Sequence, residues 1–183
     1  ILDFQHKPGA DSLFRRTIAI RREILGPEHP DYAWAVFSYA LYLVDSQRFR
    51  EAIPLAEEVL ALRGKTLADA HPAVGAAYIG LGRAQLGLGH LTEAETAIRQ
   101  SIAVRKGSLP ATHWIIASSE IALGEVLLAK GRAGEAISIL ERTLPVLEGS
   151  VGPDHPRTKE NRRQLALGYR AAGRPDQAAR FEP

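Results

Sequence analysis

The chain has 183 residues, and its 23 lysines and arginines nearly balance its 21 aspartates and glutamates, which gives a formal net charge of +2. A charge this close to neutral argues against nucleic acid or an acidic membrane surface as a partner. The absence of cysteine excludes a disulfide framework, a thiolate metal site and a cysteine nucleophile. No apolar run approaches the ~18 residues of a membrane span and no signal segment opens the chain, so we expect a soluble, cytoplasmic protein. The chain starts at Ile1 and contains no methionine, which indicates a fragment of a longer protein.

Four histidines recur along the chain at a constant interval. Each lies 42 residues after the last: His29, His71, His113 and His155. The first and the last lie in related heptapeptides, Leu-Gly-Pro-Glu-His-Pro-Asp and Val-Gly-Pro-Asp-His-Pro-Arg. A fixed period of this size is the sequence signature of a repeat array. The sequence therefore predicts several stacked copies of one small unit.

The N-terminal segment, residues 9–25, is predicted to be a helix. Its apolar residues follow a helical spacing: Ala10, Leu13, Phe14 and Ile18. A shift of 42 residues places the same pattern on a segment of the next unit: Ala52, Leu55, Ala56 and Leu60. We therefore interpret residues 9–25 as helix B, the second helix of a half-repeat whose first helix, helix A, is missing. The last helix B, residues 175–181, is also expected to be cut short.

Between these ends, each unit is predicted to form a loop, a helix A, a tight turn and a helix B. The units are residues 26–67, 68–109, 110–151 and a truncated 152–183. The predicted A helices span residues 30–46, 72–88, 111–130 and 156–172. In three of them a proline suits the first helical position, and the histidine before it should lie near the helix cap. Gly89, Gly131 and Gly173 follow the last three A helices and suit the left-handed residue that ends a helix.

Small residues inside the helices indicate how the pairs pack. Gly82 and Gly124 lie inside A helices, where glycine costs ~1 kcal/mol relative to alanine. We expect a close helix approach at these glycines, with Ala94 and Ala136 of the B helices facing them. Pro145 lies inside the third helix B, where it removes a hydrogen bond, so we expect a kink or an early stop there.

The second repeat resembles the tetratricopeptide pattern. Leu81-Gly82 matches its Leu-Gly step, and Tyr78 stands where its tryptophan would be. Ala94 and Ile98 match its Ala-x-x-x-Phe pair.

The longer period resembles the kinesin light chain type of this repeat, with the Leu-Gly-Pro-Glu-His-Pro-Asp linker and Ala19–Glu23 before it. The closing stretch, Gly152–Ala179, looks like the C-terminal repeats of bacterial serine/threonine kinases. The resemblance covers about residues 9–181. It implies an all-α, right-handed superhelix of antiparallel helix pairs.

The resemblance also implies a function, which is non-catalytic binding of a partner protein. In such families the concave surface is lined by the A helices and receives an extended peptide or a helix. Carried over to this sequence, the lining would be Trp34, Phe37, Leu41, Asp45, Ile79, Arg83, Leu86, Ile121, Glu125, Leu128, Arg163, Leu167 and Arg170. None of the corresponding positions carries the asparagine pair of kinesin light chain repeats, so we predict a mainly apolar inner face with charges spaced along it.

A metal site or an enzyme active site is less consistent with the sequence. One zinc ion needs its nitrogen ligands within ~2.1 Å, whereas equivalent residues of successive repeats are separated by a helix packing distance of at least ~8 Å. We therefore interpret the four histidines as loop or cap residues, and we expect no metal or other cofactor. Ser118, Ser119 and Glu120 lie near His113, but in a helix without the turn of a nucleophile elbow. No glycine-rich phosphate loop follows a strand, so we do not expect an enzyme.

Two questions stay open at the level of sequence. Trp34 and Phe37 either pack in the core or form an aromatic anchor for a ligand. Function also has alternatives: the chain could be a self-association module of a larger bacterial signalling protein, acting through its exposed terminal helices, or a regulator that senses a peptide.

Overall fold

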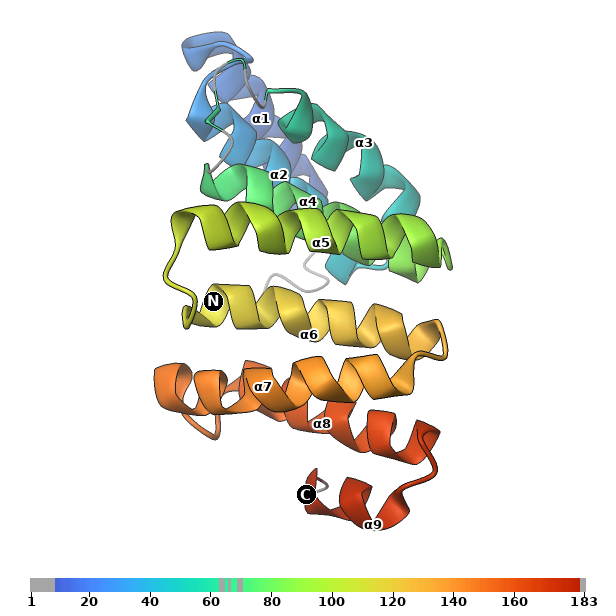
Figure 1. Ribbon diagram of the computed structural model, residues 1–183. Coiled ribbons are helices and arrows are strands. Elements are labelled where there is room, and N and C mark those ends of the chain that lie inside the picture. The colour runs from blue at the N-terminus through green and yellow to red at the C-terminus, as the bar shows by residue number, and fades with distance from the viewer. Residues whose placement is uncertain (1–8, 63–64, 66, 69–70, 182–183) are drawn as a thin grey trace. The chain divides into compact units, whose positions relative to one another are not determined.

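The computed structural model describes residues 9–62, 65, 67–68 and 71–181, and this part of the chain contains helices and no strand. The helices are α1 (Ala10–Leu25), α2 (Pro30–Asp45), α3 (Phe49–Ala61), α4 (Pro72–Gly87), α5 (Leu91–Ser108), α6 (Trp114–Ala129), α7 (Ala133–Val151), α8 (Pro156–Ala171), α9 (Pro175–Ala178) and the 3₁₀ helix η1 (Ala179–Phe181), shown in Figure 1. The even-numbered helices are the predicted A helices. The odd-numbered helices are the predicted B helices, and the all-α prediction is confirmed. None of the described helices is both long and apolar enough to span a bilayer.

The helices group into two compact units, Ile1–Val104 and Arg105–Pro183, and each is described by itself. In the first unit α1 packs on α2, while α2 and α4 pack on each other and on α3. In the second unit α6 and α8 pack on each other and on α7, and α8 also contacts α9 and η1. The A helices α2 and α8 thus each contact the B helices that precede and follow them in sequence.

Each of the four repeated histidines is the N-cap of an A helix, as predicted. The backbone N–H two residues later donates a hydrogen bond to the imidazole Nδ1, at 3.1 Å for His29 and 3.2 Å for His71, His113 and His155. Such a bond satisfies one of the N–H groups that lack a partner in the first helical turn. Because His113 forms this cap, the third A helix begins at Trp114 and not near residue 111 as expected.

The turn from helix A to helix B uses a left-handed residue in every repeat. Gly89, Gly131 and Gly173 have φ angles of 79°, 74° and 72°, which confirms the predicted stop residues. Gln47 holds the equivalent position with a φ of 59°, although it carries a side chain. In each turn the next N–H donates to the carbonyl five residues earlier, for example from Arg48 to Leu43 at 2.8 Å. This is the Schellman arrangement, which satisfies carbonyl groups at the end of the A helix.

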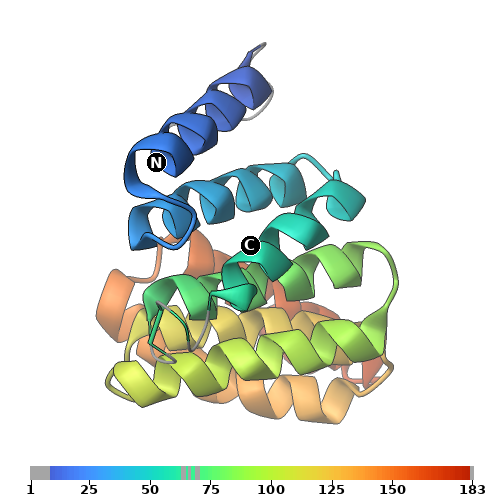
Figure 2. The same ribbon diagram turned by 90° about the horizontal axis from the view of Figure 1, so that it is seen from above.

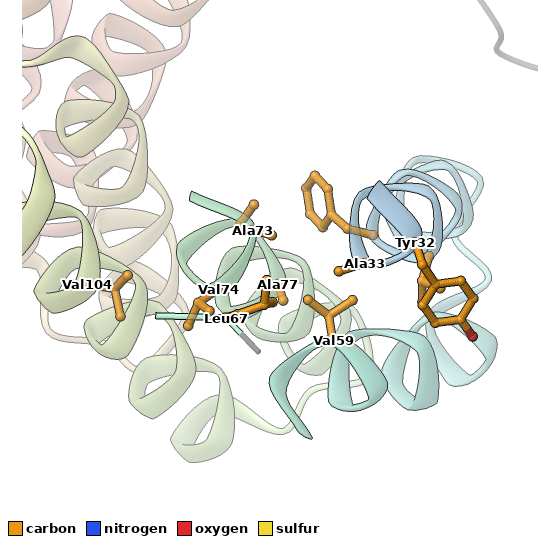
Figure 3. Close-up of a cluster of buried hydrophobic side chains, with 11 residues drawn as sticks. Tyr32, Ala33, Val59, Leu67, Ala73, Val74, Ala77 and Val104 are labelled. Atoms are coloured by element: carbon orange, nitrogen blue, oxygen red, sulfur yellow. The ribbon is translucent and has the colours of Figure 1, made fainter. Parts of the chain in front are cut away.

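The core of the first unit is built from small and branched side chains of neighbouring helices. Figure 3 shows Val59 of α3 pointing into the space between α2 and α4. Val59, Ala33 of α2 and Ala77 of α4 expose none of their surface. In the second unit Leu140 of α7 and Leu165 of α8 are equally buried. Because a single helix pair cannot bury its apolar stripe alone, these contacts between successive pairs stabilise the array.

The two helical glycines permit close packing, as predicted, although one neighbour differs from the expectation. A Cβ on Gly82 would lie 2.5 Å from Cγ1 of Ile98 and 3.2 Å from the carbonyl oxygen of Ala94. A Cβ on Gly124 would lie 2.9 Å from Leu140, and the nearest atoms there belong to Leu140 and not to the expected Ala136. Ile98 and Leu140 hold equivalent positions, one turn after the alanine. The larger side chain therefore fills the space that the missing Cβ leaves.

Of the two outcomes expected at Pro145, a kink or an early stop, the early stop does not occur. Helix α7 runs through this residue from Ala133 to Val151. Pro145 and Glu141 are both exposed, so the carbonyl of Glu141 that loses its intrahelical donor lies on the outer side of the helix. Water can satisfy a carbonyl there, which explains why the helix tolerates the proline.

Candidate partner-binding faces

In the first unit the predicted binding residues lie on α2 and α4. Trp34 is 37% exposed, Asp45 is exposed, and the half-buried members are Leu41, Ile79, Arg83 and Leu86. Nη1 of Arg83 lies 3.4 Å from Oδ1 of Asp45, so an ion pair joins the two A helices. An exposed ion pair contributes at most about 1 kcal/mol to stability. A charged partner can therefore replace either member of this pair at little cost.

The structure separates the two readings of Trp34 and Phe37. Their ring centroids lie 5.7 Å apart with the rings at 72°, an edge-to-face contact. Phe37 is only 9% exposed and belongs to the core, where it packs against α4 at Gly80. Trp34 rests on Phe37 and keeps more than a third of its surface exposed. The core reading therefore describes Phe37, and only Trp34 retains the exposed surface that an anchor would need.

In the second unit the predicted binding residues lie on α6 and α8. Leu167 is 40% exposed, Arg163 and Arg170 are exposed, and Glu125 and Leu128 are half-buried. Ile121 is 3% exposed and packs in the core of this unit, so it offers almost no surface to a partner. Among the predicted residues of this unit, the exposed apolar one is therefore Leu167, with an arginine one turn before it and another one turn after it.

The charges on α6 and α8 influence one another. Arg163 forms a bidentate pair with Glu160, with nitrogen–oxygen distances of 3.0 and 2.8 Å. The hydrogen bond to Glu160 raises the pKa of Arg163, and the negative charges of Glu160 and Glu125 raise it further against partial burial. Burial acts to raise the pKa of Glu160, but hydrogen bonds from Arg163 and Gln164 outweigh it and hold that pKa below its usual value. Both shifts favour the charged forms, so Glu160 and Arg163 are ionised together near neutral pH.

The opposite charges follow a common rule in the two units. Asp45 and Arg83 are 38 residues apart in sequence, and Glu125 and Arg163 have the same separation. This separation equals the repeat period of 42 residues shortened by one helical turn. In both pairs the carboxylate lies on one A helix and the arginine lies on the next A helix, at a position one turn nearer its N-terminus.

No group of three or more histidine, cysteine, aspartate or glutamate side chains in the described part of the chain could hold a metal ion. The Nδ1 atoms of the four repeated histidines instead accept hydrogen bonds as helix caps.

One exposed aromatic cluster was not predicted from the sequence. Trp114 takes the first helical position of α6, which proline occupies in the other three repeats. Its ring centroid lies 6.2 Å from each of the rings of His113 and His155, and it is 37% exposed. The replacement of proline by tryptophan in an otherwise regular His-Pro step was the signal that could have identified it.

Comparison with known proteins agrees with this geometry. The family model for the tetratricopeptide repeat matches residues 9–65, 37–107 and 115–182. A search of the curated proteins gives no match. A crystal structure of nearly identical TPR-like repeats of a kinesin light chain from Podosopora anserina is 27% identical, with a TM-score of 0.74, and the match covers 94% of this chain and 82% of that chain. A point variant of the same protein gives 27% identity, a TM-score of 0.76, and coverage of 94% and 81%.

The tetratricopeptide repeat model and the kinesin light chain structures thus match nearly the whole length of this chain. The chain also shows helix-capping histidines, turns that depend on glycine, and packed helix pairs. Its repeats are similar to those of kinesin light chains, as the 42-residue period predicted. The chain belongs to the tetratricopeptide repeat family.

Proposed function

We propose that this chain is a non-catalytic interaction module that binds a peptide or a helical segment of a partner protein on the faces of its A helices. Tetratricopeptide repeats generally mediate protein–protein interactions, and their fold is typically a non-catalytic scaffold. The observation that carries the proposal is the exposed apolar surface on A helices, which among the predicted binding residues comes from Trp34 on α2 and Leu167 on α8. A cytoplasmic location is compatible with this role and stays a prediction of its own.

The chemistry of these faces suggests the kind of segment that binds. Trp34 offers a large, rigid apolar surface, of the kind that dominates protein interfaces. Leu167 stands between Arg163 and Arg170, and the pair Asp45–Arg83 joins α2 to α4. Buried apolar contacts supply most of the affinity at such faces, while the charges orient the partner. We therefore expect an amphipathic segment with at least one bulky apolar side chain.

A displayed library of short random peptides tests the proposal, because such a library samples many candidate segments at once. The tightest peptide selected on the intact chain is titrated by calorimetry against variants. We expect Trp34→Ala or Leu167→Ala to weaken binding about tenfold or more, because each removes apolar area worth roughly 1–2 kcal/mol when buried. The matched control is Leu25→Ala on α1, since Leu25 has the same 40% exposure as Leu167 but lies on a B helix.

The outcomes separate clearly. Loss of affinity in an A-helix variant together with an unchanged Leu25→Ala variant supports the proposal. Equal affinity for all folded variants, or the failure of any peptide to be selected, contradicts it. Circular dichroism of each variant excludes unfolding as the cause.

A second candidate function, self-association, is favoured by a different observation. Four of the seven exposed large hydrophobic residues in the described part of the chain lie on α1: Leu13, Ile20, Ile24 and Leu25.

A further inference from the structure

We propose that the N-terminal ends of α6 and α8 form a second binding site, which takes a phosphorylated segment of a partner protein. The phosphate binds Arg105 and Arg157, and an apolar side chain beside it packs on Trp114. The site shares no residue with the A-helix faces, so the inference goes beyond the peptide binding proposed above. Figure 1 and Figure 2 both show the loops before α6 and α8 at the same end of the second unit.

Arg105, in the last turn of α5, carries a positive charge that the fold does not neutralise. Its Nη1 donates to the carbonyl of Ile115 at 3.0 Å and to the hydroxyl of Ser119, both on α6. Neither acceptor is charged, and Arg105 makes no ion pair within the described residues. Burial, followed by the nearby charge of Arg157, lowers the pKa of Arg105 to about 10, so the guanidinium stays protonated at neutral pH. A largely buried charge without a counter-ion is costly, and a bound anion would offset that cost.

One edge of the Arg105 guanidinium is available to such an anion. Both of its hydrogen bonds use Nη1, so its Nε and Nη2 have no partner within the described part of the chain. Elsewhere this same edge binds a carboxylate through two parallel hydrogen bonds. Arg48 binds Glu51 in this way, at 2.8 and 2.7 Å. Arg132 binds Glu135 in this way, at 2.7 Å for both bonds. The Nε–Nη2 edge of Arg105 therefore suits an oxyanion in the same geometry.

The excess of positive charge is particular to this part of the array. Arg21 holds the position of Arg105 two repeats earlier, and its Nη1 donates to the Asp31 carbonyl at 2.6 Å. The bond to the backbone is therefore a structural feature of the repeat. The residue that accepts it differs, because Asp31 carries a carboxylate whereas Ile115 is apolar. The equivalent residue of the next repeat, Arg157, is basic.

Acidic residues in this part of the second unit pair with other cations. Glu120 on α6 lies 3.0 Å from Lys106 and 3.5 Å from Arg142. Asp154, in the loop before α8, lies 3.4 Å from Lys159. Within the described residues, no carboxylate pairs with the guanidinium described above. We therefore infer that a ligand supplies the compensating anion.

Trp114 provides an exposed aromatic surface beside both arginines. It is 37% exposed and precedes Ile115, the residue whose carbonyl binds Arg105. Its ring centroid lies 6.2 Å from that of His155, the N-cap of α8. The Nδ1 of His155 accepts a hydrogen bond from the backbone N–H of Arg157 at 3.2 Å. The indole ring thus connects the segments that carry the two arginines.

These features favour a phosphate monoester with an apolar neighbour. A phosphate has nearly two negative charges at neutral pH and three acceptor oxygens, so it suits two arginines better than one carboxylate does. Trp114 supplies the rigid apolar area that anchors a neighbouring side chain. The first helical position is also exposed in adjoining repeats, at Pro72 and Pro156. The exposure of Trp114 is therefore a property of this edge of the array.

Titration with small anions tests the site. Phenyl phosphate, inorganic phosphate and benzoate are each added to the intact chain, and the backbone amide and indole N–H shifts are followed by NMR. We expect phenyl phosphate to bind with a dissociation constant of roughly 1 mM and to shift the resonances of Trp114, Ile115 and Arg157. Inorganic phosphate lacks the apolar group and benzoate lacks the second charge, so each should bind at least threefold more weakly.

Substitutions separate the two halves of the site. Arg105→Lys keeps the charge but removes the Nε–Nη2 edge, and should weaken phenyl phosphate at least fivefold. Trp114→Pro restores the residue of the other repeats, so the helix start is preserved. It should reduce the affinity for phenyl phosphate to that for inorganic phosphate and leave the latter unchanged. The matched control is Arg21→Lys, the equivalent arginine, which should change neither affinity. Circular dichroism checks that each variant is folded.

A peptide distinguishes a partner segment from free phosphate. A tetrapeptide in which phosphoserine precedes leucine should shift the same resonances, its serine form should not, and its glutamate form should bind at least fivefold more weakly. Equal affinity of the native chain and Arg105→Lys, or equal affinity for phenyl and inorganic phosphate, overturns the proposal. Binding of inorganic phosphate without the phosphorylated peptide overturns it as well. These variants lie outside the A-helix faces, so either proposal can fail while the other stands.

Discussion

At the scale of single residues, the turn after each A helix needs a residue with a left-handed φ, and in one repeat this residue is not glycine. Gln47 has the left-handed φ of 59° that Gly89, Gly131 and Gly173 adopt in the other repeats. A residue with a Cβ is strained in this region, by roughly 1 kcal/mol or more, whereas glycine is not. Gln47 is exposed, and no contact of its side chain offsets the strain within the described residues.

We therefore predict that Gln47→Gly raises the free energy of unfolding by about 0.5–1 kcal/mol, the relief of strain less the greater freedom of glycine in the unfolded chain. Urea denaturation followed by circular dichroism measures the change. Gln47→Ala keeps the Cβ and should bring no such gain. An equal gain from both substitutions would argue against backbone strain as the cause.

At the scale of helices, the close contact between α4 and α5 depends on Gly82. An alanine there would place its Cβ 2.5 Å from Cγ1 of Ile98, which is too close for any real contact. We predict that Gly82→Ala destabilises the chain by roughly 1–3 kcal/mol, because this overpacking outweighs the better helix propensity of alanine. The matched control is Gly107→Ala in α5, where nothing lies within 4 Å and a small gain is expected. A stabilising Gly82→Ala would show that the helices separate without cost.

The attachment of α1 to its neighbours provides a pH-dependent prediction. The Asp11 carboxylate accepts hydrogen bonds from the Tyr39 hydroxyl at 2.8 Å and from Arg48 at 2.5 Å. These bonds, that from Tyr39 first, lower the pKa of Asp11 below its ordinary value of 3.8. A lowered pKa in the folded state means that the contribution to stability is present above about pH 3.8 and is lost as the pH falls through the folded value.

Asp11→Asn should therefore remove this part of the acid dependence. The measurement is the midpoint of urea unfolding between pH 2 and pH 6 for the native chain and the variant. We expect the two curves to converge at the acid end and to separate above the ordinary pKa, with the native chain more stable. Parallel curves over the whole range would contradict a role for the ionised carboxylate.

The signals that predicted the helices from sequence were local ones. A histidine before proline marks a cap, a glycine in the turn marks a stop, and both depend on a few adjacent residues. Burial is not local, which is why the core position of Ile121 was not recognised and that of Phe37 stayed one of two alternatives. The early stop expected at Pro145 was wrong for the same reason, since the effect of a proline depends on whether the affected carbonyl reaches water. The binding role of the exposed residues stays a prediction.

At the scale of the whole molecule, stability should be unevenly distributed. Helices such as α2, α3, α7 and α8 have packed neighbours on more than one side, whereas α1 packs mainly on α2 and the four-residue α9 on α8 and η1. Native-state hydrogen exchange at low protein concentration should therefore show the fastest exchange in α1 and in α9–η1. Uniform protection along the chain would contradict this account of nearest-neighbour stabilisation.

The ion pair between Asp45 and Arg83 also bears on how such a chain can change its length. A tandem duplication of residues 68–109 would preserve the histidine cap, the left-handed turn and the close helix contact at glycine, because the inserted copy carries all three. The second copy of Arg83 would then face Gly87 in place of a carboxylate, since the residue 38 positions earlier has changed. The repeats share a backbone plan but carry charges specific to each junction, so shuffling them would keep the architecture and change the surface charge pattern.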